Sequence, residues 1–223
     1  MKVRCDQSIF KTFVKAMPIA LLLLAPFFSV ASHAENPQVK LQTDMGDIVL
    51  ELYPQQAPVT VDNFIKYVND YYYDGLIFHR VIKGFMIQSG GHTFDMSMRE
   101  GERAPIVNES FNGLTNKRGT ISMARTSDPD SAQAQFFINH KNNGSLNAKG
   151  NKAGYAVFGA VIAGMDVVDA IAETEVRNLG MHQNVPVTPI RILSARLLNA
   201  AAWTPLPEPK QLPAFEKPIP IRQ

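Results

Sequence analysis

Cysteine is almost absent from this chain of 223 residues: the single one is Cys5, near the N-terminus. A disulfide framework and a cysteine-rich metal site both need several cysteines, so neither is expected. Histidine offers no metal site either, because the histidines beyond the N-terminus do not stand at ligand spacing. These residues are His79, His92, His140 and His182. We therefore expect no metal and no other cofactor.

Two further signatures of functional sites are missing. Ser89 precedes Gly90 and Gly91, but no Gly-x-Ser-x-Gly elbow of a serine hydrolase surrounds it. The run Asp128-Pro129-Asp130 lacks the rest of a calcium-binding loop and is typical of a turn. Covalent attack by a serine and calcium binding are thus not expected.

Long apolar runs are also missing, with one exception at the N-terminus. Residues 18–30 are apolar, follow four basic residues and precede Ser32-His33-Ala34, which resembles a signal cleavage site. The run is shorter than the ~20 residues that a membrane-spanning helix needs, and Pro26 interrupts it. We predict a cleaved secretory signal over residues 1–34. An uncleaved membrane anchor is the alternative.

An excess of charge of one sign is lacking once this leader is removed. The full chain has 22 basic and 20 acidic residues, and the leader contains four of the basic residues and one acid, Asp6. The exported part therefore keeps 18 basic and 19 acidic residues, a formal charge of −1 without a lysine and arginine cluster. Nucleic acid and, after signal cleavage, a membrane are not expected partners.

The remainder of the chain is rich in short strand signals. Residues 39–43 and 48–53 read as two strands around a turn at 44–47 and predict a β-hairpin. Further strands are expected over 76–82, 85–89, 119–124, 135–138, 156–162 and 190–198. This pattern is typical of an antiparallel sheet curled into a barrel or sandwich.

Two helices and a tail complete the expected organisation. Apolar residues at helical spacing predict a helix over 58–70, with Thr60 as its cap, and a shorter helix over 165–173. From Trp203 onward six prolines exclude a helix or a central strand. We predict one domain over 35–200 and an extended, poorly ordered tail over 201–223.

The segment Phe78–Gln88 combines polar and apolar residues in a way that indicates chemistry. It holds Arg80 and Gln88 together with the large apolar residues Phe85 and Met86. Arginine does not lose its proton in a protein, so Arg80 cannot act as a general base. Its guanidinium is a fixed fork of donors, suited to holding an electron-rich atom beside an apolar pocket. The segment predicts catalysis by electrostatics and geometry.

Three later motifs accompany this segment in order. They are Gly119–Arg125, Ser131–Ile138 and Gly154–Gly159. Together with Phe78–Gln88 they resemble the cyclophilin family of peptidyl-prolyl cis-trans isomerases, over about residues 39–198. With its leader, the chain is most similar to the periplasmic cyclophilins of Gram-negative bacteria.

This resemblance implies a mainly β fold, a closed eight-stranded antiparallel barrel capped by two helices. It implies that Arg80 is the central catalytic residue, aimed at the prolyl nitrogen, and that Gln88 holds Arg80 and the substrate backbone. Phe85, also counted as catalytic, would form the proline pocket with Met86, Phe137 and Leu146. The other residues expected along the substrate groove are His79, Ala124, Arg125, Gln135 and Tyr155.

The chain departs from the family at three positions. Arg125 stands where eukaryotic members usually have asparagine, but the family uses mainly the main chain there. Ser145 stands where an aromatic residue often precedes the leucine, and Tyr155 stands where many relatives have histidine. Both changes should weaken the aromatic wall that grips cyclosporin, so we expect weak cyclosporin binding with catalysis retained.

The resemblance also implies partners and a location. The expected substrates are proline-containing segments of unfolded or folding exported proteins, in the periplasm, with a role in protein folding. Two alternatives stay open: a chaperone that holds such segments without turnover, and a scaffold that acts through the proline-rich tail. A monomer is expected because no apolar helix seam is visible.

Overall fold

A computed structural model describes residues 35–207, so the predicted signal (1–34) and the end of the predicted tail (208–223) lie outside the described residues. The first described elements are β1 (Gln38–Thr43) and β2 (Gly46–Leu52), which pair antiparallel. Val39, Leu41 and Ile48 are fully buried, while the residues between them are more exposed. The predicted hairpin is confirmed, and its alternation places one face of the sheet on the core.

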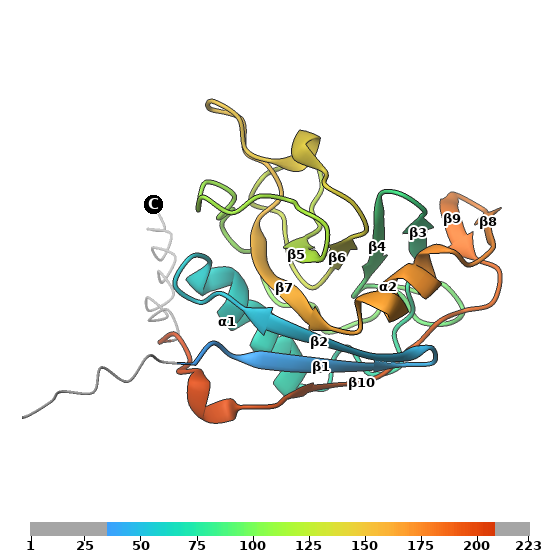
Figure 1. Ribbon diagram of the computed structural model, residues 1–223, viewed down its shortest axis with the longest axis horizontal. Coiled ribbons are helices and arrows are strands. Elements are labelled where there is room, and N and C mark those ends of the chain that lie inside the picture. Colours follow the sequence, from blue (N-terminus) through green and yellow to red (C-terminus); the bar gives the residue numbers. More distant parts are fainter. Residues whose placement is uncertain (1–34, 208–223) are drawn as a thin grey trace, which may run out of the picture. The chain divides into compact units, whose positions relative to one another are not determined.

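Eight strands form one antiparallel sheet in the order β10-β1-β2-β7-β5-β6-β4-β3. The remaining six are β3 (Arg80–Ile82), β4 (Met86–Ser89), β5 (Thr120–Met123), β6 (Phe136–Asn139), β7 (Val157–Ala163) and β10 (Ile192–Leu197). Each overlaps a strand expected from the sequence. Figure 1 shows β1, β2 and β10 side by side.

The sheet curls, but its strand pairing stays open between β3 and β10, so the predicted closed barrel is found only in part. Three backbone hydrogen bonds of 2.7–2.9 Å link residues 75–78, just ahead of β3, to residues 190–192 at the start of β10. These bonds bring the two edges together without adding a paired strand.

A second, two-stranded sheet was missed by the sequence analysis. It consists of β8 (Val176–Leu179) and β9 (His182–Pro186), which pair antiparallel beyond α2 (Met165–Ala172). All four residues of β8 are exposed, so it lacks the buried face that makes a strand visible in a sequence. β9 lies next to β3 and therefore close to Arg80 in the fold (Figure 1).

Two helices pack on the sheet, as expected: α1 (Pro58–Asn69) beside β10, and α2 beside β2, β3 and β4. The prediction that Thr60 caps α1 is wrong, because the helix begins at Pro58 and Thr60 lies inside its first turn. Glu109 replaces it: its carboxylate accepts the backbone N–H groups of Val59 (3.1 Å) and Thr60 (2.8 Å). A carboxylate there satisfies free helix N–H groups and matches the helix dipole.

An aromatic cluster fills the core between α1 and the sheet. The ring of Phe64 lies 5.1 Å from Tyr73, 5.6 Å from Phe136 and 5.2 Å from Phe158, measured between centroids. All four residues are fully buried. Burial on this scale supplies the hydrophobic stabilisation that a domain without disulfides needs.

The first residues of the predicted tail contact the domain. Trp203 packs against the core, and the backbone N–H of Leu206 donates to Asp62 Oδ1 at 2.9 Å. Residues 208–223, with most of the tail's prolines, lie outside the described residues. Across residues 35–207, no helix is both long enough and apolar enough to cross a membrane.

Candidate active site

The register of three strands aligns the central residues of the site. Arg80 of β3 stands opposite Gln88 of β4, and Gln88 stands opposite Phe137 of β6. Directly opposed residues project from the same face of a sheet. The residues between them, such as Val81, Ile87 and Ile138, point into the core instead. The core pattern thus determines that Arg80, Gln88 and Phe137 meet on the outer face.

A cavity of about 460 Å³ opens on this outer face. Its lining consists of Arg80, Phe85, Met86, Gln88, Ala124, Arg125, Phe137, Leu146 and Tyr155. All nine lining residues belong to the site expected from the sequence. Eight of them come from the four motifs, Leu146 comes from the segment between the last two motifs, and the fold brings these segments together.

Arg80 enters this cavity without a bound partner. Its side chain is partly exposed, and no hydrogen bond or ion pair joins it to another residue within 35–207. Gln88 is expected to hold Arg80, but no hydrogen bond joins these two side chains. The Gln88 amide nitrogen donates instead to Gln135 Oε1 at 3.1 Å. The donors of the guanidinium are therefore available to a ligand.

Aromatic and aliphatic side chains form the apolar part of the cavity. Met86 and Phe137 are only 2% and 4% exposed, so they are held rigidly by the packing beneath them. The ring of Tyr155 meets Phe137 edge to face, with centroids 5.6 Å apart. The Arg125 guanidinium lies over the Tyr155 ring, 4.7 Å from the ring centroid. Tyr155 thus keeps an aromatic wall in place.

The other two expected site residues lie outside this cavity. Gln135 lines a neighbouring cavity of about 290 Å³ that also contacts Gln88, Ala124 and Arg125. Gly91 leaves room for it, since a Cβ there would lie 2.6 Å from Gln135 Nε2. His79 lines neither cavity and is 6% exposed, so the cavity lining does not support its expected place beside the groove.

His79 instead belongs to a row of three neighbouring histidine rings, with His92 and His182. Its ring centroid lies 4.3 Å from His92, and His92 lies 5.1 Å from His182. Burial lowers the pKa of His79 to about 3, and the nearby His92, His182 and Arg80 add to this effect. His79 is therefore neutral at physiological pH. No group of acidic, histidine or cysteine residues within 35–207 could hold a metal ion.

Three buried asparagines, Asn116, Asn139 and Asn143, form an amide cluster that the sequence analysis missed. The Asn143 amide nitrogen donates to Phe85 O (2.8 Å) and to Asn139 Oδ1 (2.7 Å). The Asn139 amide nitrogen donates to Asn116 Oδ1 at 3.2 Å. Asn116 in turn donates to Tyr155 O at 3.3 Å. The cluster therefore ties Phe85 and Tyr155, on two sides of the cavity, to one buried network.

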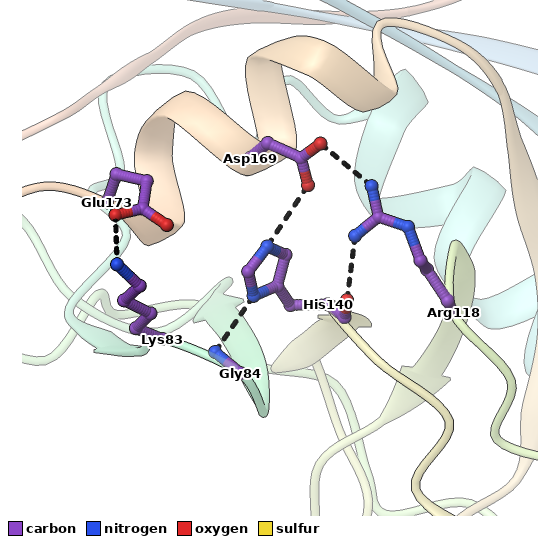
Figure 2. Close-up of polar contacts among 6 residues, drawn as sticks. All are labelled: Lys83, Gly84, Arg118, His140, Asp169 and Glu173. Carbon is purple, nitrogen blue, oxygen red and sulfur yellow. Dashed lines mark hydrogen bonds and ion pairs between the residues drawn. The ribbon is translucent and has the colours of Figure 1, made fainter.

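A second network fastens the turn before Phe85 to helix α2 (Figure 2). The Gly84 backbone N–H donates to His140 Nδ1 at 2.9 Å, and His140 Nε2 lies 3.1 Å from Asp169. Arg118 donates to Asp169 Oδ2 (2.7 Å) and to His140 O (2.7 Å). The hydrogen bond between Arg118 and Asp169 lowers the pKa of Asp169. Because Nδ1 accepts the hydrogen bond from Gly84, the ring hydrogen of His140 lies on Nε2, the nitrogen that faces Asp169.

These features define a class of site. A cation with free donors stands in a cavity with an apolar floor, and buried hydrogen bonds anchor Phe85 in the wall of that cavity. Such a site binds a neutral group that is part apolar and part electron-rich, and it can stabilise a change in that group's electron distribution. It fits a protein that acts on a peptide bond next to an apolar residue.

Comparison with known proteins identifies the family. The family model "Cyclophilin type peptidyl-prolyl cis-trans isomerase/CLD" matches residues 38–197. A peptidyl-prolyl cis-trans isomerase of Acinetobacter baylyi is 53% identical over 170 residues, which cover 75% of this chain and 89% of the relative. Peptidyl-prolyl cis-trans isomerase A of Dickeya dadantii is 47% identical over 186 residues, covering 83% and 97%.

A solved structure points the same way. The cyclophilin-type isomerase of Cryptosporidium parvum, determined in the presence of the dipeptide Ala-Pro, is 27% identical with a TM-score of 0.60. The match covers 72% of this chain and 98% of the Cryptosporidium chain. The chain belongs to the cyclophilin family and is a peptidyl-prolyl cis-trans isomerase.

Proposed function

We propose that Arg80 catalyses rotation about X–Pro bonds by stabilising the twisted amide, while the apolar cavity holds the proline ring. The observation that carries this proposal is the shared cavity: unpaired donors and an apolar floor meet within about 460 Å³. The substrates are proline-containing segments of other proteins.

The physical reason lies in the peptide bond itself. Delocalisation of the nitrogen lone pair keeps the bond planar, and rotation costs ~18–20 kcal/mol. In the twisted state the lone pair returns to the prolyl nitrogen, which becomes a hydrogen-bond acceptor. A donor aimed at this nitrogen interacts with the twisted state and not with the planar one, so it lowers the barrier. No proton transfer is needed, which suits arginine.

The other residues divide the remaining tasks. Phe85, Met86, Phe137 and Leu146 fix the proline ring so that the preceding residue turns. Gln88, held by Gln135, presents its amide to the substrate backbone, and Ala124 and Arg125 border the same path. Because Met86 and Phe137 are almost fully buried, the pocket is formed before substrate binds.

The proposal includes a setting in the cell. Residues 1–34 are a cleaved signal, residues 35–200 the isomerase domain and 201–223 a tail, in a monomeric periplasmic protein. A sequence without cysteine beyond Cys5 suits an oxidising compartment. Uncatalysed X–Pro isomerisation takes tens to hundreds of seconds and can limit folding. Assistance to the folding of exported proteins follows as the physiological role.

Weak cyclosporin binding is part of the same proposal. Ser145 is exposed and lines a neighbouring groove rather than the cavity, so it contributes no aromatic surface there. Tyr155 does contribute a ring, which makes Ser145 the more important of the two departures. Sub-micromolar inhibition of the purified protein by cyclosporin would contradict this part.

The test of Arg80 is the rate at which a short X–Pro peptide isomerises. Loss of a single preorganised donor typically lowers a rate about a hundredfold or more, so this loss in kcat/KM is expected for Arg80→Ala. Arg80→Lys keeps the charge without the fork of donors and should recover only part of the rate. Circular dichroism checks that both variants fold.

The outcome separates catalysis from simple holding. Equal rates for wild type and Arg80→Ala would refute the role of Arg80. A wild-type protein that binds the peptide without accelerating its isomerisation would instead indicate a chaperone.

A further inference from the structure

A second groove adjoins the proline cavity. It has a volume of about 950 Å³ and shares Arg125, Leu146 and Tyr155 with the cavity that contains Arg80. A peptide seated with its proline in the cavity can therefore continue into this groove. Most of its lining residues lie between positions 144 and 154, in the gold segment that leads into β7 and projects at the top of the view in Figure 1.

Two lysines that line this groove, Lys149 and Lys152, are paired with each other in a short hairpin, the lysine hairpin (residues 149–152). The backbone N–H of Lys149 donates to Lys152 O and that of Lys152 donates to Lys149 O, both at 3.0 Å. Opposed residues in such a pair project from the same face, and like charges in that position are destabilising. Both side chains are exposed, and neither is paired with a carboxylate in the part of the chain that the structure describes. The hairpin thus holds two unneutralised cations together.

Arg125 contributes a third cation from the neighbouring wall. Its guanidinium donates to Gly154 O (3.2 Å), Ala153 O (3.1 Å) and Thr126 O (2.9 Å). These carbonyl groups fix its position, but they do not neutralise its charge. Arg125 therefore ties the base of the lysine hairpin to the proline cavity and extends the positive surface between them.

Asp128 and Asp130, which flank the groove residue Pro129 in the sequence, do not themselves line the groove. Asp128 Oδ1 accepts the backbone N–H of Asp130 (3.0 Å), and Asp130 Oδ1 accepts that of Asn108 (2.7 Å). Asp128 is thereby held within its own loop, and Asp130 is held against the loop that carries Asn108. The groove is lined by three cations and by no carboxylate, in a protein whose exported part is close to neutral.

We propose that this groove selects substrates that carry an aspartate or glutamate two to four residues from the proline. That separation corresponds to about 7–13 Å of extended chain, which leads out of the proline cavity. The lysine pair would then share one carboxylate, and the repulsion within the hairpin would be offset. The inference rests on the proposed function, since it names the substrate class of the same site.

The test compares matched peptides in the isomerisation assay. Each pair contains Glu or Gln at the same position, two, three or four residues before the proline in one series and after it in the other. The ratio of kcat/KM for Glu over Gln is measured at low salt and at about 0.5 M salt, where exposed charges are screened. The proteins are wild type, Lys149→Gln/Lys152→Gln, and the control Lys117→Gln/Lys141→Gln, which removes the same charge outside the groove.

Wild type and the control are expected to favour the Glu peptide about three- to tenfold in one series at low salt. High salt and the Lys149→Gln/Lys152→Gln change should both bring the ratio close to one. A ratio near one for wild type in both series, or an unchanged ratio in the Lys149/Lys152 variant, would overturn the proposal. Failure of the proposed function looks different, because the Gln peptides would then not be turned over at all.

Discussion

The proline cavity and the lysine-lined groove beside it are held in opposite ways. On one side, Phe85, Met86 and Phe137 rest on buried strands and on the amide cluster of Asn116, Asn139 and Asn143. On the other, the lysine hairpin is exposed and its tip is closed by two backbone hydrogen bonds. The side proposed to act on the amide is fixed from several directions, while the side proposed to read flanking residues is open.

This difference has a physical basis. Electrostatic stabilisation of a transition state is effective when its donors need no rearrangement during the reaction. Recognition of variable flanking sequence has no such requirement, so long exposed side chains suffice. We expect changes beneath the fixed side to affect stability and rate together, and changes in the hairpin to affect substrate preference alone.

The largest effect should follow removal of an amide from the cluster. Asn139 is fully buried, donates to Asn116 and Thr120, and accepts from Asn143. Asn139→Ala leaves these partners unsatisfied, which we expect to lower the free energy of unfolding by about 3 kcal/mol. Urea denaturation measures this change.

Asn151→Ala in the lysine hairpin is the matched control, because Asn151 is exposed. Its effect should stay within about 0.5 kcal/mol. Equal effects of the two substitutions would remove the distinction between the two sides.

How far the sequence predicts this molecule depends on where each signal lies. The β1–β2 hairpin and α1 are predictable because burial repeats with their own periods, as in Val39 and Leu41. The β8 strand is not, since no residue in it is buried. The cap of α1 is also hidden, because Glu109 comes from about fifty residues further along the chain.

The site shows the same division. Eight of its nine cavity residues stand in the four contiguous motifs that carry the resemblance, and Leu146 stands between the last two of them. Asn116, Asn139 and Asn143 lie at the edges of strands and in loops, where asparagine usually indicates a turn. Only the tertiary structure shows that their amides are buried against one another.

An intermediate effect should appear when acid is added. Burial lowers the pKa of His79 to about 3, from about 6.5 in an unfolded chain. Between these values the unfolded state binds the proton and the folded state does not, so stability falls as pH falls. One such group contributes a slope of about 1.4 kcal/mol per pH unit below pH 6. His79 directly precedes β3, so this weakening belongs to the fixed side.

Denaturation curves at pH 7, 6 and 5 for wild type and His79→Leu measure this contribution. The variant should have a shallower dependence on pH by about the stated slope. His92, whose pKa is also lowered by burial, contributes in the same direction and remains in both proteins. Parallel curves for the two proteins would show that His79 is not the group responsible.

The smallest effect separates two contacts at α2, one from Asp169 inside the helix and one from Glu173 just after its end (Figure 2). Asp169 reaches Arg118 and His140, which accepts the Gly84 N–H beside Phe85, while Glu173 pairs only with the exposed Lys83. Because the Asp169 side chain is 40% exposed, we expect Asp169→Asn to cost less than about 1 kcal/mol. It should still lower kcat/KM a few-fold, since the turn that carries Phe85 loses its support.

Glu173→Gln removes an exposed pair and should change neither stability nor rate measurably. If both substitutions lower the rate equally, general charge on α2 matters rather than the connection through His140, and the fixed side then ends at the amide cluster.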